Sequence, residues 1–248
     1  MRRNEQLITG EIYHVFNKSI AGYEIFNSES DFLRIKQMIL YYSIEKPPMS
    51  FSNFLQHVSW NDFGQNIYEL KEFNREIIQI IAYCIMPTHL HLVVKQLKDN
   101  GVERAVGNIL NSYTRYFNLK RKRKGPLWVS RFKNVRVESD EQLLHLTRYV
   151  HLNPVTAGIV KNPLHWYASS YHEYVQSVKD NLKISSYKDI LEINPSQYAK
   201  FVQDGVEYQK ELARIKNFLL EEQVLPKMNL RGSRGLKKKK LIMDPGGS

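Results

Sequence analysis

Two neighbouring runs of apolar residues near the middle of the chain have the length and composition of β-strands. The first covers residues 77–86, the second covers residues 89–96, and only Pro87-Thr88 separates them. In the second run apolar residues alternate with His89 and His91, so both histidines lie on one face of the predicted strand. The short link predicts that the two strands pair in antiparallel fashion.

Apolar residues recur at helical spacing in three further segments, residues 28–42, 102–119 and 140–152. Ser28 stands where an N-cap is expected, directly before the first of these stripes. Pro154 is expected to end the third helix, because the residue before a proline avoids the helical region.

Residues 11–16 and 128–137 are rich in β-branched and aromatic residues, which predicts a first and a fourth strand. The element order is then strand, helix, strand, strand, helix, strand, helix. This order predicts an α+β fold with a ferredoxin-like split βαββαβ unit, an antiparallel sheet covered by helices on one face. We assign it to a domain of residues 1–175, with residues 49–74 as an insertion.

The C-terminal part of the chain differs in composition from this domain. Helical spacing over residues 190–222 predicts a helical appendage within residues 176–225. Residues 226–248 are polar, basic and glycine-bearing, so we expect this tail to be disordered.

Composition narrows the class of protein. A chain of 248 residues with 42% hydrophobic content can bury a sizeable core. No apolar run approaches the roughly 18 residues of a membrane span, and Met1 to Gln6 are not followed by the apolar segment of a secretory signal. Cys84 is the only cysteine and falls in an apolar run, so an internal disulfide is excluded and a buried thiol in a reducing cytoplasm is expected.

The net charge of +11 and the pI near 9.5 favour a polyanionic partner, with nucleic acid first. Nine basic and no acidic residues fall between Arg115 and Arg136. A solvated charge run is one interpretation; the interleaved Trp128 and Phe132 favour phosphate contacts combined with base stacking. The candidate DNA-binding residues are Arg115, Lys120, Arg121, Lys122, Arg123, Lys124, Trp128, Arg131, Lys133 and Arg136.

The histidine pair and one tyrosine are the candidates for chemistry. Two imidazoles two residues apart on a strand can share a metal ion, or can be hydrogen-bonded histidines at a sheet edge, and the spacing of His89 and His91 alone does not decide between these. Tyr149 and Asn153 lie four residues apart and share a helix face. Tyr149 falls off the apolar stripe, as a boundary tyrosine with a solvated hydroxyl would also do.

Several motifs occur together in an order that resembles the HUH single-tyrosine transposase family, and within it the REP-associated tyrosine transposases. The resemblance covers residues 8 to about 175, and Thr88 departs from it, because the family often has asparagine before the first histidine. The motifs are Tyr13-His14-Val15-Phe16-Asn17, Met86-Pro87, His89-Leu90-His91, Gly125-Pro126-Leu127-Trp128 with Arg131-Phe132, Arg148 to Val155, Ala157 to Val160 and Ser169-Ser170-Tyr171.

The resemblance implies a nuclease and strand transferase that acts on single-stranded or hairpin DNA, with no membrane partner. His89, His91 and Asn153 would hold a divalent metal, Mg²⁺ or Mn²⁺, with zinc left open on affinity grounds. Tyr149 would attack the scissile phosphate, forming a 5′-phosphotyrosine and freeing a 3′-hydroxyl. A phenol is a weak nucleophile at neutral pH. A metal that binds the phosphate oxygens would stabilise the developing charge and orient the phosphate for in-line attack.

Alternatives remain open at this stage. His14 is a further candidate ligand, His151 is expected to be structural or DNA-facing, and Tyr113 and Tyr116 are rival nucleophiles, of which Tyr113 falls on an apolar stripe. A non-catalytic regulator that binds DNA or RNA hairpins, or a metal-dependent phosphodiesterase, would share much of this sequence pattern. The sequence does not decide between a monomer and a homodimer.

Overall fold

A computed structural model describes residues 6–59, 62–177 and 182–211 of the chain. Its centre is a four-stranded antiparallel sheet with the strand order β2-β3-β1-β4. The two central strands, β1 and β3, pair with each other although they are far apart in the sequence. The strands are β1 Ile12–Lys18, β2 Ile78–Met86, β3 His89–Gln96 and β4 Lys133–Arg136.

The predicted helices are present, and two short helices occupy the predicted insertion. Ser28 caps the first helix as expected, because its side chain accepts a hydrogen bond from the backbone N–H of Asp31. The helices are α1 Glu29–Tyr42, α2 Phe51–His57, α3 Phe63–Phe73, α4 Gly101–Lys120, α5 Asp140–Thr156, α6 Tyr171–Tyr174 and α7 Pro195–Asp204.

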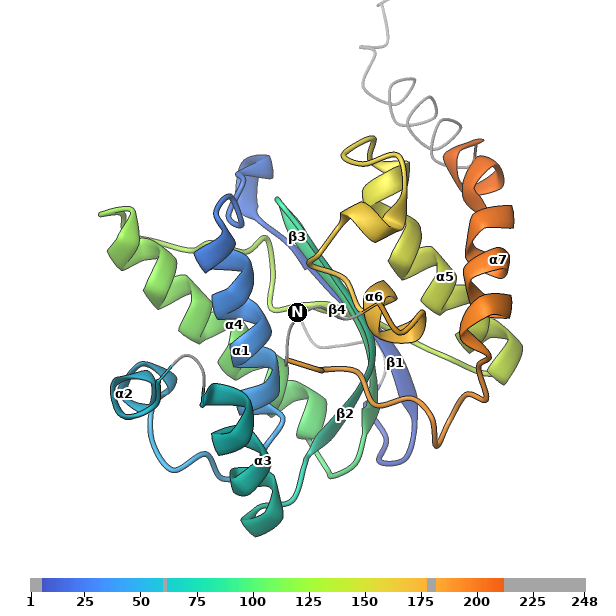
Figure 1. Cartoon of the computed structure of the whole chain (residues 1–248). Helices are drawn as coiled ribbons and strands as arrows, with labels where there is room; N and C mark the ends of the chain where they lie inside the picture. The colour runs from blue at the N-terminus through green and yellow to red at the C-terminus, as the bar shows by residue number, and fades with distance from the viewer. Residues whose placement is uncertain (1–5, 60–61, 178–181, 212–248) are drawn as a thin grey trace, which may run out of the picture. The chain divides into compact units, whose positions relative to one another are not determined.

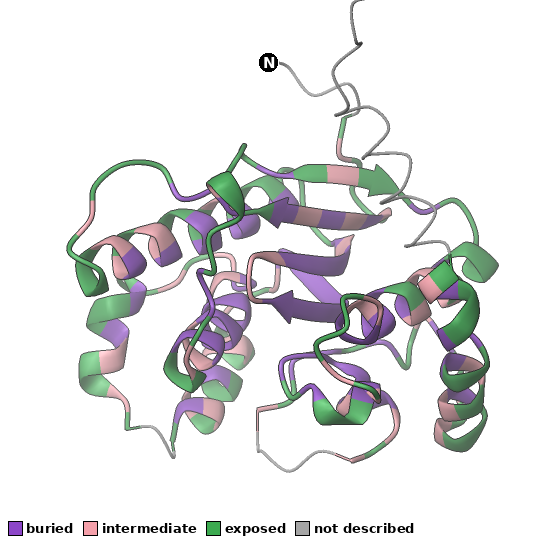
Figure 2. Cartoon of the chain, turned by 90° about the horizontal axis from the view of Figure 1, so that it is seen from above, coloured by how far each residue is buried: buried purple, intermediate pink, exposed green. Residues whose placement is uncertain are grey.

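The sheet is covered on both faces, which corrects the prediction of helices on one face only. In Figure 1, α1 and α4 lie on one side of the sheet, and α5, α6 and α7 lie on the other. The reason is visible in the burial of β3: Leu92 and Val93, which point to opposite faces, are both fully buried. A sheet that is apolar on both faces needs a covering layer on each. Figure 2 shows the interior strands coloured almost entirely as buried and one edge strand mostly as exposed.

The third predicted helix continues past Pro154 instead of ending there. A proline removes one intrahelical donor, leaving the carbonyl of Val150 without its usual N–H. The side-chain amide of Asn153 lies 3.5 Å from that carbonyl oxygen, and the N–H of Ala157 bonds the Asn153 carbonyl at 2.9 Å. The helix therefore runs to Thr156, and Asn153 lies in its last turn.

The fourth strand is shorter than the predicted residues 128–137. Trp128 makes only an isolated bridge to Ser19, and regular pairing begins at Lys133. Between them the side-chain amide of Asn17 donates to the carbonyls of Ser130 and Arg131, at 2.9 and 2.8 Å. A side chain thus takes the place of a strand partner for these two carbonyls.

Part of the predicted C-terminal appendage is described. Helix α7 packs against α5, where the hydroxyl of Tyr198 lies 2.9 Å from Thr147 Oγ1. Residues 212–225 and the predicted tail 226–248 lie outside the described residues. Across the described ranges, none of the helices has the length and apolar character needed to cross a membrane.

Candidate active site

Four aromatic side chains from three elements meet on one face of the sheet. The rings of His89 and His91 on β3 have centroids 5.1 Å apart, and His14 on β1 stacks on His91, also at 5.1 Å. The ring of Tyr149 on α5 stands edge-on to both His14 and His91, at 6.0 and 5.9 Å. The histidine pair and the tyrosine that the sequence predicted separately are therefore neighbours.

Strand register explains how His14 reaches this cluster. In the β1–β3 pairing Phe16 lies opposite His91 and Lys18 lies opposite His89. Since paired residues point to the same face, the alternate residues His14, Phe16 and Lys18 line the histidine face.

Both predicted metal-binding histidines have their Nδ1 atoms engaged. The Oγ1 of Thr88 lies 2.9 Å from Nδ1 of His89, and Nε2 of His14 lies 2.9 Å from Nδ1 of His91. Nε2 is therefore the nitrogen that each ring would offer to a metal. Thr88, the departure from the family pattern, bonds directly to the first of the two histidines.

Burial keeps the imidazoles of His14 and His89 in their neutral form. His91 is only 7% exposed. Burial lowers the pKa of His14 to about 4, and burial together with the charge of Lys18 lowers the pKa of His89 to about 4. A neutral imidazole is the form that binds a metal.

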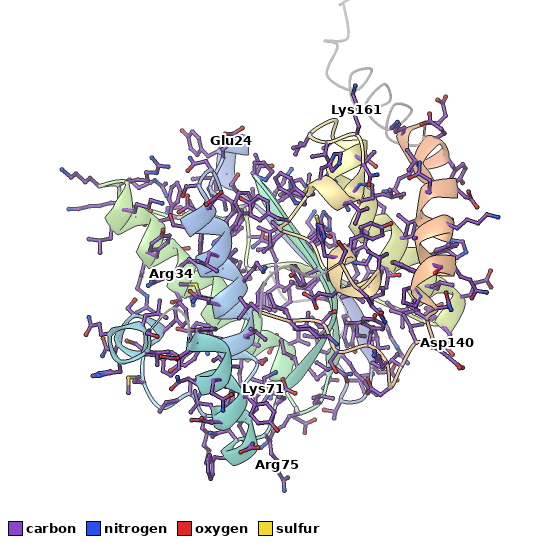
Figure 3. All side chains as sticks on the ribbon, viewed as in Figure 1. Glu24, Arg34, Lys71, Arg75, Asp140 and Lys161 are labelled. Atoms are coloured by element: carbon purple, nitrogen blue, oxygen red, sulfur yellow. The ribbon has the colours of Figure 1, made fainter. Side chains whose placement is uncertain are left out.

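Tyr149 is positioned as a boundary residue with an accessible edge, since it is 39% exposed. Burial of part of the ring raises the pKa of its phenol, and a hydrogen bond from the Asn153 side chain opposes that rise. The hydroxyl is therefore protonated at neutral pH and needs activation before it can act as a nucleophile. Figure 3 labels Asp140, the first residue of α5, and Lys161, which follows its end, so that the helix can be traced between them.

Asn153 is half-buried one turn beyond the tyrosine. Its Nδ2 donates to the carbonyl of Tyr149 at 3.0 Å, so the amide nitrogen is used within the helix. Oδ1 is then the atom that it would present to a hard cation. The part of the chain that the structure describes contains no group of three His, Cys, Asp or Glu side chains arranged to hold a metal. The candidate set is instead mixed, with two imidazoles and one carboxamide oxygen.

The other candidate residues lie elsewhere. His151 is fully buried, with Nδ1 2.7 Å from the Tyr198 hydroxyl and Nε2 2.8 Å from Ser170 Oγ, so it is a structural residue rather than a DNA-facing one. The Tyr113 hydroxyl donates to the Ile25 carbonyl at 2.5 Å in the core.

Tyr116, the other rival nucleophile, donates to Asp31 Oδ1 at 2.9 Å. This contact places its hydroxyl against α1 and away from the histidine cluster on α5's side of the sheet.

The ten predicted DNA-binding residues divide into three groups. Four are tied to other protein groups: Lys120 bonds Asp31 at 2.7 Å, Arg121 bonds Asn27 at 2.5 Å, Arg123 bonds Asn118 at 2.7 Å and Arg136 bonds Glu11 at 2.9 Å. The other five basic side chains are exposed and make no side-chain hydrogen bond or ion pair with the described residues, namely Arg115, Lys122, Lys124, Arg131 and Lys133.

Trp128 forms the third group and corrects the prediction of base stacking. It is 9% exposed, and its indole N–H lies 3.2 Å from the Leu110 carbonyl and 3.1 Å from Thr114 Oγ1. Phe132 is buried as well, at 8%. Both rings are packed in the hydrophobic core, so neither is available to stack on a base.

Phe16 and Lys18 also line the histidine face, although neither was among the predicted site residues. Phe16 is partly exposed on the histidine face, its ring lies 6.0 Å from that of His91, and Lys133 lies opposite it on β4. The alternation His14-x-Phe16-x-Lys18 has the same period as His89-x-His91 and was the available signal. Only the strand register shows that the two alternations share a face.

A family model matches the segment that carries the candidate metal ligands and the candidate nucleophile. The family model described as transposase IS200 like matches residues 58–153, a segment that includes His89, His91, Tyr149 and Asn153. Residues 58–153 are therefore similar to the IS200-like transposases. The match ends at Asn153, and the strand β1 that carries His14 lies outside it.

One solved structure is similar to this chain over most of its length. It is a REP-associated tyrosine transposase bound to a REP hairpin, and it covers 78% of this chain and 99% of its own at 14% sequence identity, with a TM-score of 0.48. No curated protein matches the sequence.

Proposed function

We propose that this chain is a metal-dependent single-stranded DNA endonuclease and strand transferase that uses Tyr149 as its nucleophile. The observation that carries the proposal is the meeting of Tyr149 with His91, at 5.9 Å between ring centroids, although α4 and β4 separate them in the chain. The order of strands and helices supports a ferredoxin-like split βαββαβ unit as the catalytic domain, which we assign to residues 1–175.

The donor set suits a divalent metal such as Mn²⁺ or Mg²⁺. Nε2 of His89, Nε2 of His91 and Oδ1 of Asn153 would hold the ion, a mixture of imidazole and amide donors that leaves room for phosphate oxygens. When bound, the ion would polarise the scissile phosphate and neutralise charge that develops on it. The neutral state of His89 and the use of both Nδ1 atoms by other groups support this assignment.

The chemistry assigned to Tyr149 is an in-line displacement at phosphorus. Its phenolic oxygen forms a bond to phosphorus as its proton leaves, and the bond from phosphorus to the 3′ oxygen breaks. The released 3′ oxygen takes up a proton, so the products are a 5′-phosphotyrosine and a 3′-hydroxyl. Because the phosphodiester energy is retained, a different 3′-hydroxyl can attack the phosphotyrosine and rejoin the strand.

We propose single-stranded or hairpin DNA as the substrate, in keeping with the family resemblance and the net charge of +11. Lys18 and Lys133 flank the partly exposed ring of Phe16 on the histidine face, which supports backbone contacts and base stacking beside the nucleophile. Tyr149 stands beside histidines of its own chain, and this supports a site completed within one monomer rather than across a homodimer.

The test uses a single-stranded hairpin oligonucleotide incubated with Mn²⁺ and resolved on a denaturing gel. We expect a covalent protein–DNA adduct that Tyr149→Phe and His91→Ala abolish and that EDTA prevents. Tyr68→Phe, at an exposed tyrosine of α3 that is 60% accessible, is the matched control and should retain the adduct.

The same gel separates the alternatives. Cleavage without an adduct would indicate a phosphodiesterase that uses water, and a band shift without cleavage on any hairpin tested would indicate a non-catalytic hairpin-binding regulator. Either result would overturn the assignment of Tyr149 as the nucleophile.

A further inference from the structure

We infer that His14 is a positioning residue that holds His91 in the tautomer needed to bind a metal. This inference deepens the proposed function and rests on its metal site. The observation is the contact between Nε2 of His14 and Nδ1 of His91 at 2.9 Å, with the two rings stacked at an interplanar angle of 19°.

One proton lies between these two nitrogens, and its direction decides what His91 can do. When His91 donates from Nδ1, its Nε2 carries the lone pair and can accept a metal. When His14 donates instead, neutral His91 carries its proton on Nε2, which then cannot act as a ligand. Metal binding therefore requires His14 to be the acceptor in this bond.

The fold holds His14 in place for this role. His14 sits on central strand β1, two residues from Phe16, which pairs with His91. Its ring lies 5.0 Å from that of Phe16 and 6.0 Å from that of Tyr149, so neighbours on two sides restrict its rotation. Thr88 Oγ1 makes the equivalent contact with Nδ1 of His89.

An outer hydrogen-bond partner of this kind typically changes metal affinity by about 10–100-fold. His14→Phe keeps a planar ring of similar size on the strand but removes the acceptor, whereas His14→Gln keeps an acceptor oxygen. The two variants therefore separate the hydrogen bond from simple packing.

The experiment titrates Mn²⁺ into each protein in the absence of DNA and follows free Mn²⁺ by its paramagnetic resonance signal. We expect His14→Phe to weaken binding by about 10–100-fold and His14→Gln to restore most of that loss. His57→Phe, at an exposed histidine at the end of α2, controls for the loss of a histidine as such and should bind like wild type.

A second measurement needs no metal and remains informative if a variant is less stable. Long-range ¹H–¹⁵N spectra report histidine tautomers, and we expect His91 as the Nδ1–H form in wild type and in His14→Gln. In His14→Phe we expect a shift toward the Nε2–H form.

The outcomes distinguish the role of His14 from the metal site itself. Wild-type Mn²⁺ affinity in His14→Phe, or equal losses in His14→Phe and His14→Gln, would overturn the inference while leaving the metal site intact. If wild type binds no Mn²⁺, or if His91→Ala binds it as wild type does, the proposed metal site fails and the role of His14 fails with it.

Discussion

The side-chain amide of Asn153 donates to the backbone carbonyl of Tyr149, 3.0 Å away and one turn earlier on α5. The same nitrogen lies 3.5 Å from the carbonyl of Val150, which Pro154 deprives of its helical donor. Asn153 therefore has a structural role in the helix that carries the nucleophile, in addition to the ligand role proposed for Oδ1.

Two substitutions at this position separate these roles. Asn153→Ala and Asn153→Asp both remove the amide donor and should each lower the free energy of unfolding by about 1 kcal/mol. Only Asn153→Ala removes the oxygen, so it alone should weaken Mn²⁺ binding substantially. Urea unfolding and Mn²⁺ titration check this. Asn66→Ala on α3 is the control, because the Asn66 amide also donates to the carbonyl four residues earlier. Equal losses of Mn²⁺ affinity in the two Asn153 variants would argue against the ligand role.

His151 should matter for stability and not for the metal. It is fully buried between Tyr198 and Ser170, and His151→Ala leaves both hydroxyls without this partner and creates a cavity. We expect the free energy of unfolding to fall by about 2–4 kcal/mol. Mn²⁺ affinity per folded molecule should be unchanged; a variant of wild-type stability with impaired Mn²⁺ binding would refute this assignment.

The buried carboxylate of Asp31 should give the protein a specific acid sensitivity. Burial alone raises its pKa, but hydrogen bonds from Lys120, Ser28 and Tyr116 and the charge of Lys120 outweigh this and hold it below the ordinary 3.8. Because the folded pKa is the lower one, the contribution to stability is present above pH 3.8 and is lost as the pH falls through the folded value.

Unfolding by urea at several pH values checks this. Asp31→Asn should cost about 2 kcal/mol at pH 7, and the difference from wild type should shrink as the pH falls below about 4. Glu11→Gln, which breaks the solvent-exposed pair with Arg136, is the control and should cost under about 1 kcal/mol. A difference that is independent of pH would contradict the lowered pKa.

The exposed and the paired basic residues should differ in DNA binding. Replacing Lys122 and Lys124 by glutamine should reduce the slope of log affinity against log salt by about 0.7 for each phosphate of single-stranded DNA that is no longer neutralised. Arg136→Gln should change the slope less, because its guanidinium already bonds Glu11. Fluorescence anisotropy with a labelled hairpin at several salt concentrations measures the slopes; equal effects would show that the ion pair opens on binding.

Local sequence was sufficient for the elements that form through near-neighbour interactions. The alternation after Pro87 predicted β3 with His89 and His91 on one face, and Ser28 predicted the start of α1. Each depends on residues within a few positions, since strand alternation and helix capping are local effects. The helix that carries Tyr149 was predicted for the same reason, and its extension past Pro154 was missed because a side chain compensates for the lost donor.

Contacts between residues that are far apart in the sequence were decided only by the tertiary structure. Local pattern does not show that β1 pairs with β3, and this register is what brings His14 to His91. The same holds for Trp128, which lies between the basic residues Lys124 and Arg131 in the sequence but whose ring contacts in space come from the core. The sequence by itself thus determined the chemical groups and their faces. The assembly of those faces into one site depended on long-range strand pairing and burial, which no stretch of a few residues encodes.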